Sequence, residues 1–466
     1  MNRLGRLRTY ARLGPMNIAR VAVYRLGLKS ARHSVQRLTA PAIDPPFFRA
    51  PDHYNVLPLP NTNWDNSLWW FGWYRQPRQD VPPDWFSNPF SSSPQPNADL
   101  DWWCIPDFGA GDIKGIWELS RFDWMLAWAT EAAHGEEAAL KRLNLWLADW
   151  VQSNPPFKGP NWKCGQEASF RVMHLVTAAW ILGQDREPEP GLMAMLLAHL
   201  QRIGPTMSYA IGQQNNHGTS EAAALFIGGS FLSGHHPHAE KWERKGRRWL
   251  EERAVALIAP DGSSSQYSVT YHRLMLDTFS MAEAWRRHRG IPAFSSRLTR
   301  RLSAATDWLL TLTDAETGDA PNIGANDGAR LMQLTGSDYR DFRPSVQLAA
   351  SLFSGTDPFG PGPWTAPLRW LGVVEEGSKA APQSKSFDDG GYHVLRRGKA
   401  MAVLRYPRFR FRPSQADALH LDLWHRGINL LRDAGTFSYN SEGAEWFSST
   451  AAHNTAAKTP MVISIA

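Results

Sequence analysis

Three consecutive side chains able to bind an anion open the most informative stretch of the sequence. Asn215 and Asn216 carry amides, His217 carries a titratable imidazole, and an apolar run of helix-forming residues, 222–232, follows closely. We therefore place Asn216 and His217 at the start of a helix, where the helix dipole and free backbone N–H groups attract anions. A substrate carboxylate suits such a site. The alternative is an asparagine pair in a loop beside a histidine that caps the helix.

The residues after His217 are expected to begin this helix. Thr219 or Ser220 can serve as its N-cap, and Glu221 then falls in the first turn, where a negative charge is favourable. The predicted helix therefore runs from 219 to 233.

Three further groups of polar residues lie at the starts of predicted helices. One contains Glu118, the second Glu167 and Arg171, and the third Tyr271 and Arg273. Glu167 and Arg171 are four positions apart, a spacing that supports an ion pair. In a ring of antiparallel helices, the helix starts at one end surround a single cleft, which would bring these groups together. They could equally be surface ion pairs and ordinary helix caps.

Amphipathic patterns indicate that helices dominate the chain up to about residue 355. The predicted helices are 115–133, 136–152, 166–182, 190–203, 219–233, 238–257, 271–288, 296–313 and 344–354. Many antiparallel helix pairs of this length, joined by short loops, favour an α/α toroid. No sequence repeat of fixed period is visible.

The composition changes near residue 357, where glycine and proline cluster before a polar linker. Strand-like segments follow at 391–396, 400–406, 419–423 and 428–433. The expected fold class is α+β multidomain: an α/α toroid, as an incomplete barrel of helical hairpins, followed by an antiparallel β-sheet domain that is short or truncated. The predicted bounds are 1–43 for a basic arm, 44–356 for the toroid, 357–386 for the linker and 387–466 for the sheet domain.

The positive charge of the chain is concentrated in residues 1–43. The formal net charge is +6, but this segment contains nine Lys or Arg and no Asp or Glu, so the rest of the chain carries −3. Leu4, Leu7, Tyr10 and Ala11 recur there at helical spacing, which is typical of an amphipathic basic helix. We expect the arm either to contact a membrane surface peripherally or to pack on the body with its arginines in solvent. We expect no nucleic-acid partner, because the body is acidic.

Targeting signals, cysteines and tryptophans give further indications of the kind of protein this is. No signal peptide is visible, and no run of about 18 apolar residues predicts a membrane-spanning helix. Cys104 and Cys164 fit neither a disulfide framework nor a zinc ribbon, so we expect free thiols. The 22 tryptophans include candidates for stacking platforms, and with an anion site they indicate a sugar ligand.

Nine stretches, taken in order, resemble the heparinase II/III family of polysaccharide lyases, including its alginate and oligoalginate lyase relatives. They are 112–121, 161–171, 215–224, 268–277, 322–330, 390–396, 415–424, 430–439 and 450–455. The resemblance implies an α/α toroid followed by an antiparallel sheet domain, with the cleft between them. It also implies β-elimination on a uronic-acid polysaccharide, of glycosaminoglycan or alginate type, in the cell envelope or periplasm. The lack of a visible signal peptide leaves the cytoplasm as the alternative.

The resemblance also implies roles for individual residues. Tyr271 matches the catalytic tyrosine, 54 positions after His217, and would protonate the leaving sugar oxygen. Asn216 and His217 would neutralise the substrate carboxylate, and a neutral His217 could instead take the proton. Tyr267 competes for the catalytic role but lacks the His-Arg that follows Tyr271. The residues expected to bind substrate or line the cleft are Glu118, Glu167, Arg171, Asn215, Arg273, Arg410, Arg412 and Gln415.

The sheet domain departs from the family pattern just before residue 418. Many relatives carry His-x-His-x-Asp there, whereas this chain has Gln415 and Asp417 but neither histidine, so we expect no base from this loop. Some relatives hold a structural zinc through the second histidine, an Asp and a later His. Asp433 and His453 match the last two, but Gln415 is a poor zinc ligand. We therefore expect no zinc and no other cofactor, and we expect His420 to be a packed or edge histidine of a strand.

Arginines alternate with phenylalanines at 408–412. With a period of two, Arg408, Arg410 and Arg412 share one face of a strand, and Phe409 and Phe411 share the other. The strand is either an ordinary amphipathic one with a solvated basic face, or a row of arginines along the cleft that contacts carboxylates or sulfates.

Two other classes of function stay open. A glycoside hydrolase on the same toroid would need two opposed carboxylates, for which Glu118, Glu167 and Asp327 are candidates. A non-catalytic protein that binds or assembles acidic glycans is favoured by the missing loop histidines.

Overall fold

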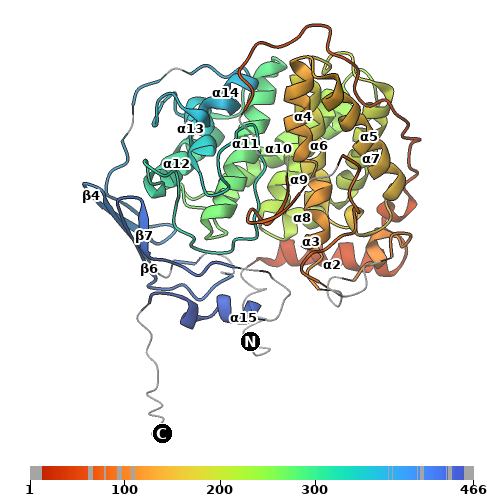
Figure 1. Ribbon diagram of the computed structural model, residues 1–466. Helices are drawn as coiled ribbons and strands as arrows, with labels where there is room; N and C mark the ends of the chain where they lie inside the picture. Colours follow the sequence, from red (N-terminus) through yellow and green to blue (C-terminus); the bar gives the residue numbers. More distant parts are fainter. Residues whose placement is uncertain are drawn as a thin grey trace.

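The computed structural model describes residues 13–60, 67–77, 80–91, 97–106, 111–375, 377–379, 381–406, 408–409, 414–436, 438 and 443–455. A helical toroid comes first in the chain, and a separate antiparallel sheet follows it (Figure 1). The predicted helical positions Leu4, Leu7, Tyr10 and Ala11 of the basic arm lie outside the described residues. Among the described residues, no helix combines the length and apolar character that crossing a bilayer requires.

The toroid is built from helices joined mostly by short loops. The helices are α2 (Pro15–Lys29), α3 (Lys114–Trp117), α4 (Trp124–Ala133), α5 (Glu137–Ser153), α6 (Gly165–Ile181), α7 (Pro190–Ile203), α8 (Met207–Gly212), α9 (Asn216–Phe231), α10 (Ala239–Leu257), α11 (Val269–His288), α12 (Ser296–Leu312), α13 (Arg343–Phe353) and α14 (Ala366–Trp370), and α15 (Ala444–Phe447) follows the sheet. Helix α9 packs against α6, α10 and α11, and almost every one of its side chains is buried. This central position fixes the start of α9, where Asn216 and His217 lie.

Tryptophan serves mainly as core in this protein. The rings of Trp124, Trp128 and Trp146 pack with centroids 4.8 to 5.2 Å apart, and all three are buried. Such aromatic packing stabilises the fold through area and ring geometry. The expected stacking platforms for sugars are therefore restricted to the few tryptophans that reach a cavity.

In the part of the sheet domain that the structure describes, five antiparallel strands lie in the order in which they occur in the chain. They are β3 (Lys385–Phe387), β4 (Tyr392–Arg397), β5 (Ala400–Arg405), β6 (Leu421–His425) and β7 (Ile428–Leu431). One face of the sheet packs on α12, where Tyr392 lies edge-on to Trp308 at 5.1 Å. Arg396 donates to the carbonyls of Thr311 and Thr313 at the end of that helix. These contacts hold the sheet against the toroid.

Sequence periodicity predicted most helices within a few residues and failed at particular points. The predicted helix 115–133 is broken into α3, a 3₁₀ turn and α4, because Phe122 adopts a left-handed backbone with φ +65°. A small hairpin of β1 (Ser67–Trp70) and β2 (Tyr74–Pro77) occurs where no strand was predicted. The strand β3 was also missed, since three residues carry too little pattern to be recognised.

Candidate active site

Tyr271 lies in the first turn of α11 and its hydroxyl meets a carboxylate. Ser268 caps this helix: its Oγ accepts the backbone N–H of Tyr271 at 3.0 Å and donates to the carbonyl of Ala325 at 2.6 Å. The hydroxyl of Tyr271 donates to Oδ2 of Asp327 at 2.8 Å, and the ammonium of Lys114 pairs with the same oxygen. Tyrosine, carboxylate and ammonium from three separate segments therefore form one largely buried chain.

The loop that carries Asp327 approaches the start of α11 very closely. Gly324 in this loop has φ +83°, and a Cβ atom there would lie 2.2 Å from the carbonyl oxygen of Tyr267. Val269 also donates its backbone N–H to the carbonyl of Ile323 at 3.1 Å. Only glycine fits this position without strain, and the tight fit places Asp327 against Tyr271.

The carboxylate of Asp327 is held in its ionised form. Burial alone would raise the pKa of Asp327, but the ammonium of Lys114 and, more weakly, Arg121 and the Tyr271 hydroxyl bring the pKa below its ordinary value. The Tyr271 hydroxyl is therefore held by a charged acceptor at the start of α11.

Asn215, Asn216 and His217 occupy the positive end of α9, as predicted, but the helix begins earlier than expected. Asn215 is the N-cap, and its Oδ1 accepts the backbone N–H of His217 at 3.2 Å. The predicted caps at 219 and 220 are therefore wrong, because the asparagine side chain satisfies the helix start three residues sooner. Glu221 consequently lies in the second turn, where burial raises its pKa to about 8.

Asn216 is fixed by two glutamines. Its Oδ1 accepts a hydrogen bond from Nε2 of Gln266 at 2.9 Å, and its Nδ2 donates to Oε1 of Gln166. An amide held at both ends cannot rotate. It keeps its remaining N–H in a fixed direction, which suits the recognition of a carboxylate.

His217 is half-buried beside this amide and interacts electrostatically with Asp327, the residue that holds Tyr271. Burial lowers its pKa below the ordinary value of 6.5, and the charges of Lys114 and Asp327 also act on it. Its Nδ1 lies 3.9 Å from Sγ of Cys164. At neutral pH the imidazole is therefore uncharged and able to accept a proton.

Glu118 and Glu167, two of the residues predicted to line the cleft, both bind Arg121. The sequence did not identify Arg121 as a site residue. Arg121 donates to both oxygens of Glu167, at 2.7 and 3.1 Å, and also pairs with Glu118. Glu118 accepts in addition the backbone N–H of Phe71 at 3.0 Å. The predicted ion pair of Glu167 with Arg171 is wrong, because among the described residues Arg121 takes both carboxylate oxygens in a bidentate geometry.

Arg171 and Arg273 are fully enclosed by protein. Arg171 donates to Nε2 of His199 at 2.8 Å and stacks over the ring of Trp150 at 5.0 Å. Arg273 lies between the rings of Tyr339 and Phe342. Neither guanidinium reaches solvent, so the structure corrects the expectation that they contact substrate: they support the walls of the site.

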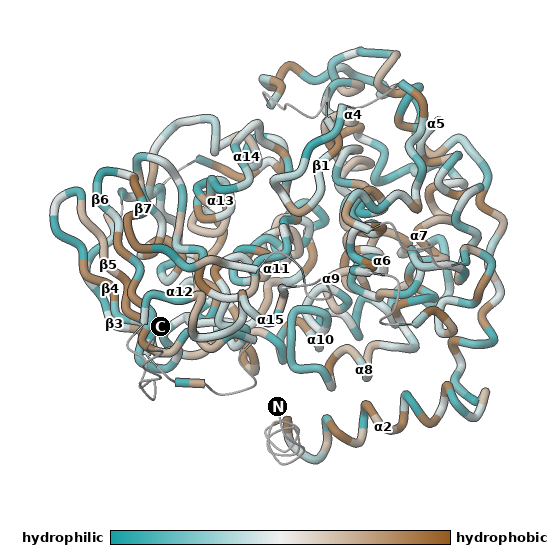
Figure 2. The backbone as a smooth tube through the Cα atoms, turned by 60° about the horizontal axis from the view of Figure 1, so that its bottom comes forward, coloured by the Kyte–Doolittle hydropathy of each residue, from teal (hydrophilic) through white to brown (hydrophobic). Residues whose placement is uncertain are grey.

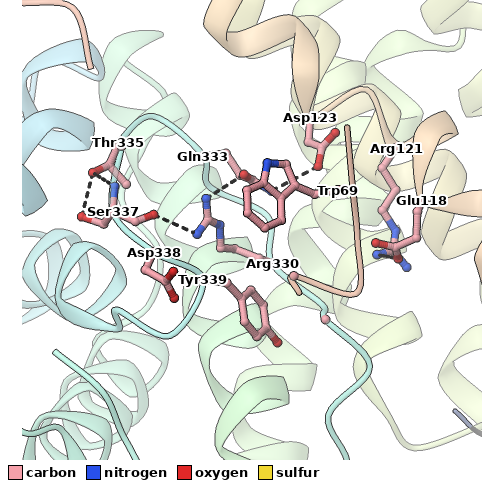
Figure 3. Close-up of a pocket in the computed structure, with 13 residues that line it drawn as sticks. Trp69, Glu118, Arg121, Asp123, Arg330, Gln333, Thr335, Ser337, Asp338 and Tyr339 are labelled. Carbon is pink, nitrogen blue, oxygen red and sulfur yellow. Dashed lines mark hydrogen bonds and ion pairs between the residues drawn. The ribbon is translucent and has the colours of Figure 1, made fainter. Parts of the chain in front are cut away.

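A pocket of about 200 Å³ lies next to the Glu118–Arg121 pair (Figure 3). Trp69, from strand β1, contributes an indole ring to its lining, and the loop 328–339 contributes Arg330 and Gln333. Arg330 donates to Gln333 at 2.6 Å, and Gln333 donates in turn to Asp123 at 3.1 Å. Gly328, which also lines the pocket, directly follows Asp327 in the chain. The pocket therefore adjoins the tyrosine site.

Of the sheet-domain residues predicted to bind substrate, the structure describes only Gln415. Arg410 and Arg412 lie outside the described residues, so the predicted arginine row stays untested. Phe409 packs edge-on against Tyr267 at 5.2 Å. Gln415 is buried and donates to Oγ1 of Thr436 at 2.7 Å.

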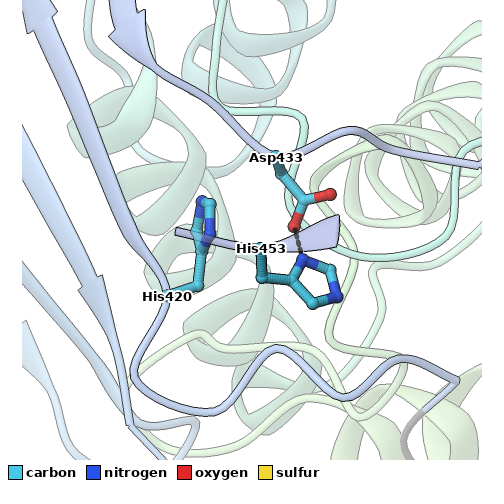
Figure 4. Close-up of side chains that lie close together, drawn as sticks. All are labelled: His420, Asp433 and His453. Atoms are coloured by element: carbon cyan, nitrogen blue, oxygen red, sulfur yellow. Dashed lines mark ion pairs between the residues drawn. The ribbon is translucent and has the colours of Figure 1, made fainter. Parts of the chain in front are cut away.

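Three potential metal ligands converge in the sheet domain (Figure 4). One ligand atom each from His420, Asp433 and His453 lies within 4.8 Å of the other two, and all three residues are buried. His420 directly precedes β6 and is fully buried, so of the two expected settings it is the packed histidine and not the edge one. His420 therefore lies near Asp433 and His453, the two residues that the sequence matched to zinc ligands, where Gln415 was expected to supply no third ligand.

His420, Asp433 and His453 offer nitrogen and oxygen atoms of the kinds that bind zinc. The hydrogen bond made by His420, however, does not suit a zinc ligand. Nδ1 of His420 accepts the backbone N–H of Asn454 at 3.2 Å, which leaves the ring proton on Nε2, whereas a ligating histidine donates from its second nitrogen. Asp433 and His453, 3.0 Å apart, then remain as two ligands, too few for a structural zinc. The hydrogen bond to His420 therefore speaks against zinc, although Nε2 of the same ring is buried with no hydrogen-bond partner among the described residues, and we assign no chemical step to a metal.

Comparisons with known proteins agree with this architecture. The family description of the heparinase II/III N-terminus matches residues 83–327, and that of the heparinase II/III-like C-terminal region matches residues 379–457. A crystal structure of heparinase III is 19% identical, with a TM-score of 0.54, and the match covers 81% of this chain and 57% of that one. The heparinase III-BT4657 gene product is 19% identical, with a TM-score of 0.50, over 77% of this chain and 58% of that one.

These structural matches concern the fold, since the identities are low. The chain spans less than two thirds of the length of the solved structures it matches. No curated protein sequence matches the chain.

Proposed function

The chain belongs to the heparinase II/III family, and from this we propose that it cleaves a uronate-containing acidic polysaccharide by β-elimination. The observation that carries the proposal is the tyrosine hydroxyl held by Asp327 beside an uncharged histidine and a fixed asparagine amide. These are the three kinds of group that an elimination next to a carboxylate requires.

The first requirement is stabilisation of charge on the substrate carboxylate. Elimination removes the proton on C5 of the uronate, which is weakly acidic because the neighbouring carboxylate is already negative. The free N–H of Asn216 and the start of α9 would bind that carboxylate and stabilise the enolate-like charge that develops on it.

The second requirement is a base that is free of its proton and an acid that carries one at the same pH. His217 is uncharged near neutral pH because burial lowers its pKa, so it would take the C5 proton. Tyr271, whose hydroxyl donates to Asp327, would give its proton to the leaving oxygen on C4. This division of roles needs no histidine from the loop at 413–417, where relatives carry one and this chain does not.

The pocket lined by Trp69 would hold a neighbouring sugar. The indole offers a stacking surface, and the side chains of Arg330, Gln333 and Asp123 offer hydrogen bonds to hydroxyl groups. The sugar substituents that this pocket accepts would decide between a glycosaminoglycan and an alginate as the polymer.

The geometry does not favour the hydrolase alternative. Both oxygens of Glu167 accept from Arg121, and the two oxygens of Glu118 accept from Arg121 and from the N–H of Phe71. Asp327, the third candidate, accepts from Lys114 and Tyr271, so all three carboxyl groups are held by protein donors and a hydrolase is less well supported than a lyase.

Incubation of the protein with a panel of uronic-acid polymers tests the proposal. Elimination creates an unsaturated uronyl end that absorbs in the ultraviolet, whereas hydrolysis creates new reducing ends without that absorbance. We expect both signals to rise in equal amounts on at least one polymer. New reducing ends without absorbance would establish a hydrolase, and binding without either signal would establish a glycan-binding protein.

A further inference from the structure

Helix α2 lies on the outside of the toroid with one side against α8 (Figure 2). On the packed side, the ring of Tyr24 stacks on Tyr209 with centroids 4.1 Å apart. A Cβ atom on Gly212 would lie 3.2 Å from Cγ2 of Val21, so the two helices are in close contact. The orientation of α2 on the body is therefore fixed.

The opposite side of α2 exposes a line of apolar side chains. Met16, Val23 and Leu26 are 66%, 70% and 66% exposed. Together with Ala19 they are spaced three or four positions apart, so they form one stripe along the helix. Scattered apolar residues are normal on a protein surface, but a continuous stripe marks a contact with an apolar phase or a partner.

The same surface is strongly basic. Arg25 and Lys29 are exposed beside the stripe, and Arg32 and Arg37 follow the helix. Residues 13–43 contain no Asp or Glu, although the chain beyond residue 43 is net acidic. An apolar stripe flanked by cations is the pattern of a helix that lies in the headgroup region of a bilayer.

We infer that α2 is a docking surface for an anionic lipid bilayer. Attraction between the cations and acidic headgroups would bring the helix to the membrane, and Met16, Val23 and Leu26 would insert below the headgroups. An acidic polysaccharide would use the cations but leaves the apolar stripe unexplained. A second copy of the chain would bring Arg25 and Lys29 of two molecules into mutual repulsion.

Docking through α2 would also orient the active site. Helix α8, on which α2 packs, leads through residues 213–215 directly into the start of α9, where Asn216 and His217 lie. A bilayer bound by α2 would thus lie near the part of the toroid that carries the site. The enzyme would meet a polymer at a membrane surface.

Co-sedimentation of the full chain with lipid vesicles tests the inference. We compare phosphatidylcholine vesicles with vesicles that also contain phosphatidylglycerol, and expect binding to the second kind that weakens with salt. The double variant Val23→Ser/Leu26→Ser should bind at least about tenfold more weakly, from lost apolar burial. The double variant Arg25→Gln/Lys29→Gln should lose roughly fivefold for each charge.

Leu145→Ser is the matched control, because Leu145 is a comparably exposed apolar residue on another helix, α5. It should bind vesicles like the wild type, and all variants should keep the wild-type melting temperature and turnover of a soluble oligosaccharide. Equal binding to both kinds of vesicle, or full binding by the Val23→Ser/Leu26→Ser variant, would overturn the inference. Loss of self-association in that variant, with vesicle binding unchanged, would identify a second copy as the occupant instead.

Discussion

The hydroxyl of Tyr271 lies 2.8 Å from Oδ2 of Asp327, and Lys114 pairs with the same carboxylate oxygen. The cation keeps Asp327 ionised despite its burial, and the anion in turn accepts the hydrogen bond of the hydroxyl and orients it. The relationship supports our proposal that Tyr271 is the acid of the reaction and His217 the base.

Replacement of Tyr271 by phenylalanine should abolish most of the activity. The change removes the proton donor and leaves the ring in place, so turnover should fall by roughly two to four orders of magnitude. The melting temperature should barely change. Tyr267→Phe is the control, because Tyr267 packs on Phe409 and is the neighbouring tyrosine just before α11. An active Tyr271→Phe variant, or an inactive Tyr267→Phe variant, would remove Tyr271 from this role.

The dependence of kcat/KM on pH should report the histidine. Because burial lowers the pKa of His217 below 6.5, the uncharged base is already present at neutral pH and is lost only in more acidic solution. We therefore expect the acid limb of the profile to lie below pH 6.5. A limb at or above that value would show that a different group, or a charged imidazole, controls the reaction.

Trp69→Ala should weaken substrate binding more than turnover. The indole lines the pocket beside the tyrosine site, so its loss removes stacking on a sugar that does not itself react. KM should rise by roughly tenfold while kcat stays within about twofold, because stacking on an aromatic ring contributes on the order of 1 kcal/mol. Trp446→Ala, at an exposed tryptophan of α15, is the control and should leave both constants unchanged. An unchanged KM in Trp69→Ala would exclude the pocket from substrate binding.

The purified protein should hold no stoichiometric zinc. The N–H of Asn454 fixes the ring of His420 with its lone pair on Nδ1, and Gln415 offers no imidazole in its place. Elemental analysis should find no zinc, and chelators should leave the melting temperature unchanged. One zinc per chain, lost together with stability in a His420→Ala variant, would show that the ring reorients to bind metal.

The sequence predicted the parts of the fold and site that depend on local pattern. Helical periodicity located α7 and α11, and the amide-rich start of α9 followed from the residues before an apolar run. The family resemblance supplied Tyr271, whose position in the first turn of α11 the structure confirms. Its catalytic role stays a prediction.

Contacts between distant segments could not be predicted from local pattern. Asp327 meets Tyr271 from a loop with no periodicity, 56 positions away, and the sequence offered it only as a hydrolase carboxylate. The spacing of Glu167 and Arg171 predicted a pair, but Arg121, from the turn before α4, bound that carboxylate with better geometry. In both cases burial decided the partner, because a buried charge must be matched wherever in the chain its partner lies. The Gly-Ala-Asn-Asp-Gly run at 324–328 indicates a loop of defined backbone conformation. It is the feature of the sequence that could have pointed to Asp327.

The rate of unsaturated product formation by Asn216→Ala and His217→Ala, measured beside glycan affinity, tests the central claim most directly. Both residues are proposed to act as negative charge develops, so each loss should raise the barrier by about 2.7–4 kcal/mol, as for other groups that stabilise a transition state. We predict that turnover at saturating substrate falls by two to three orders of magnitude, roughly, while affinity by calorimetry changes far less. If both variants bind more weakly but cleave at the wild-type rate when saturated, the proposed elimination site at the start of α9 is wrong.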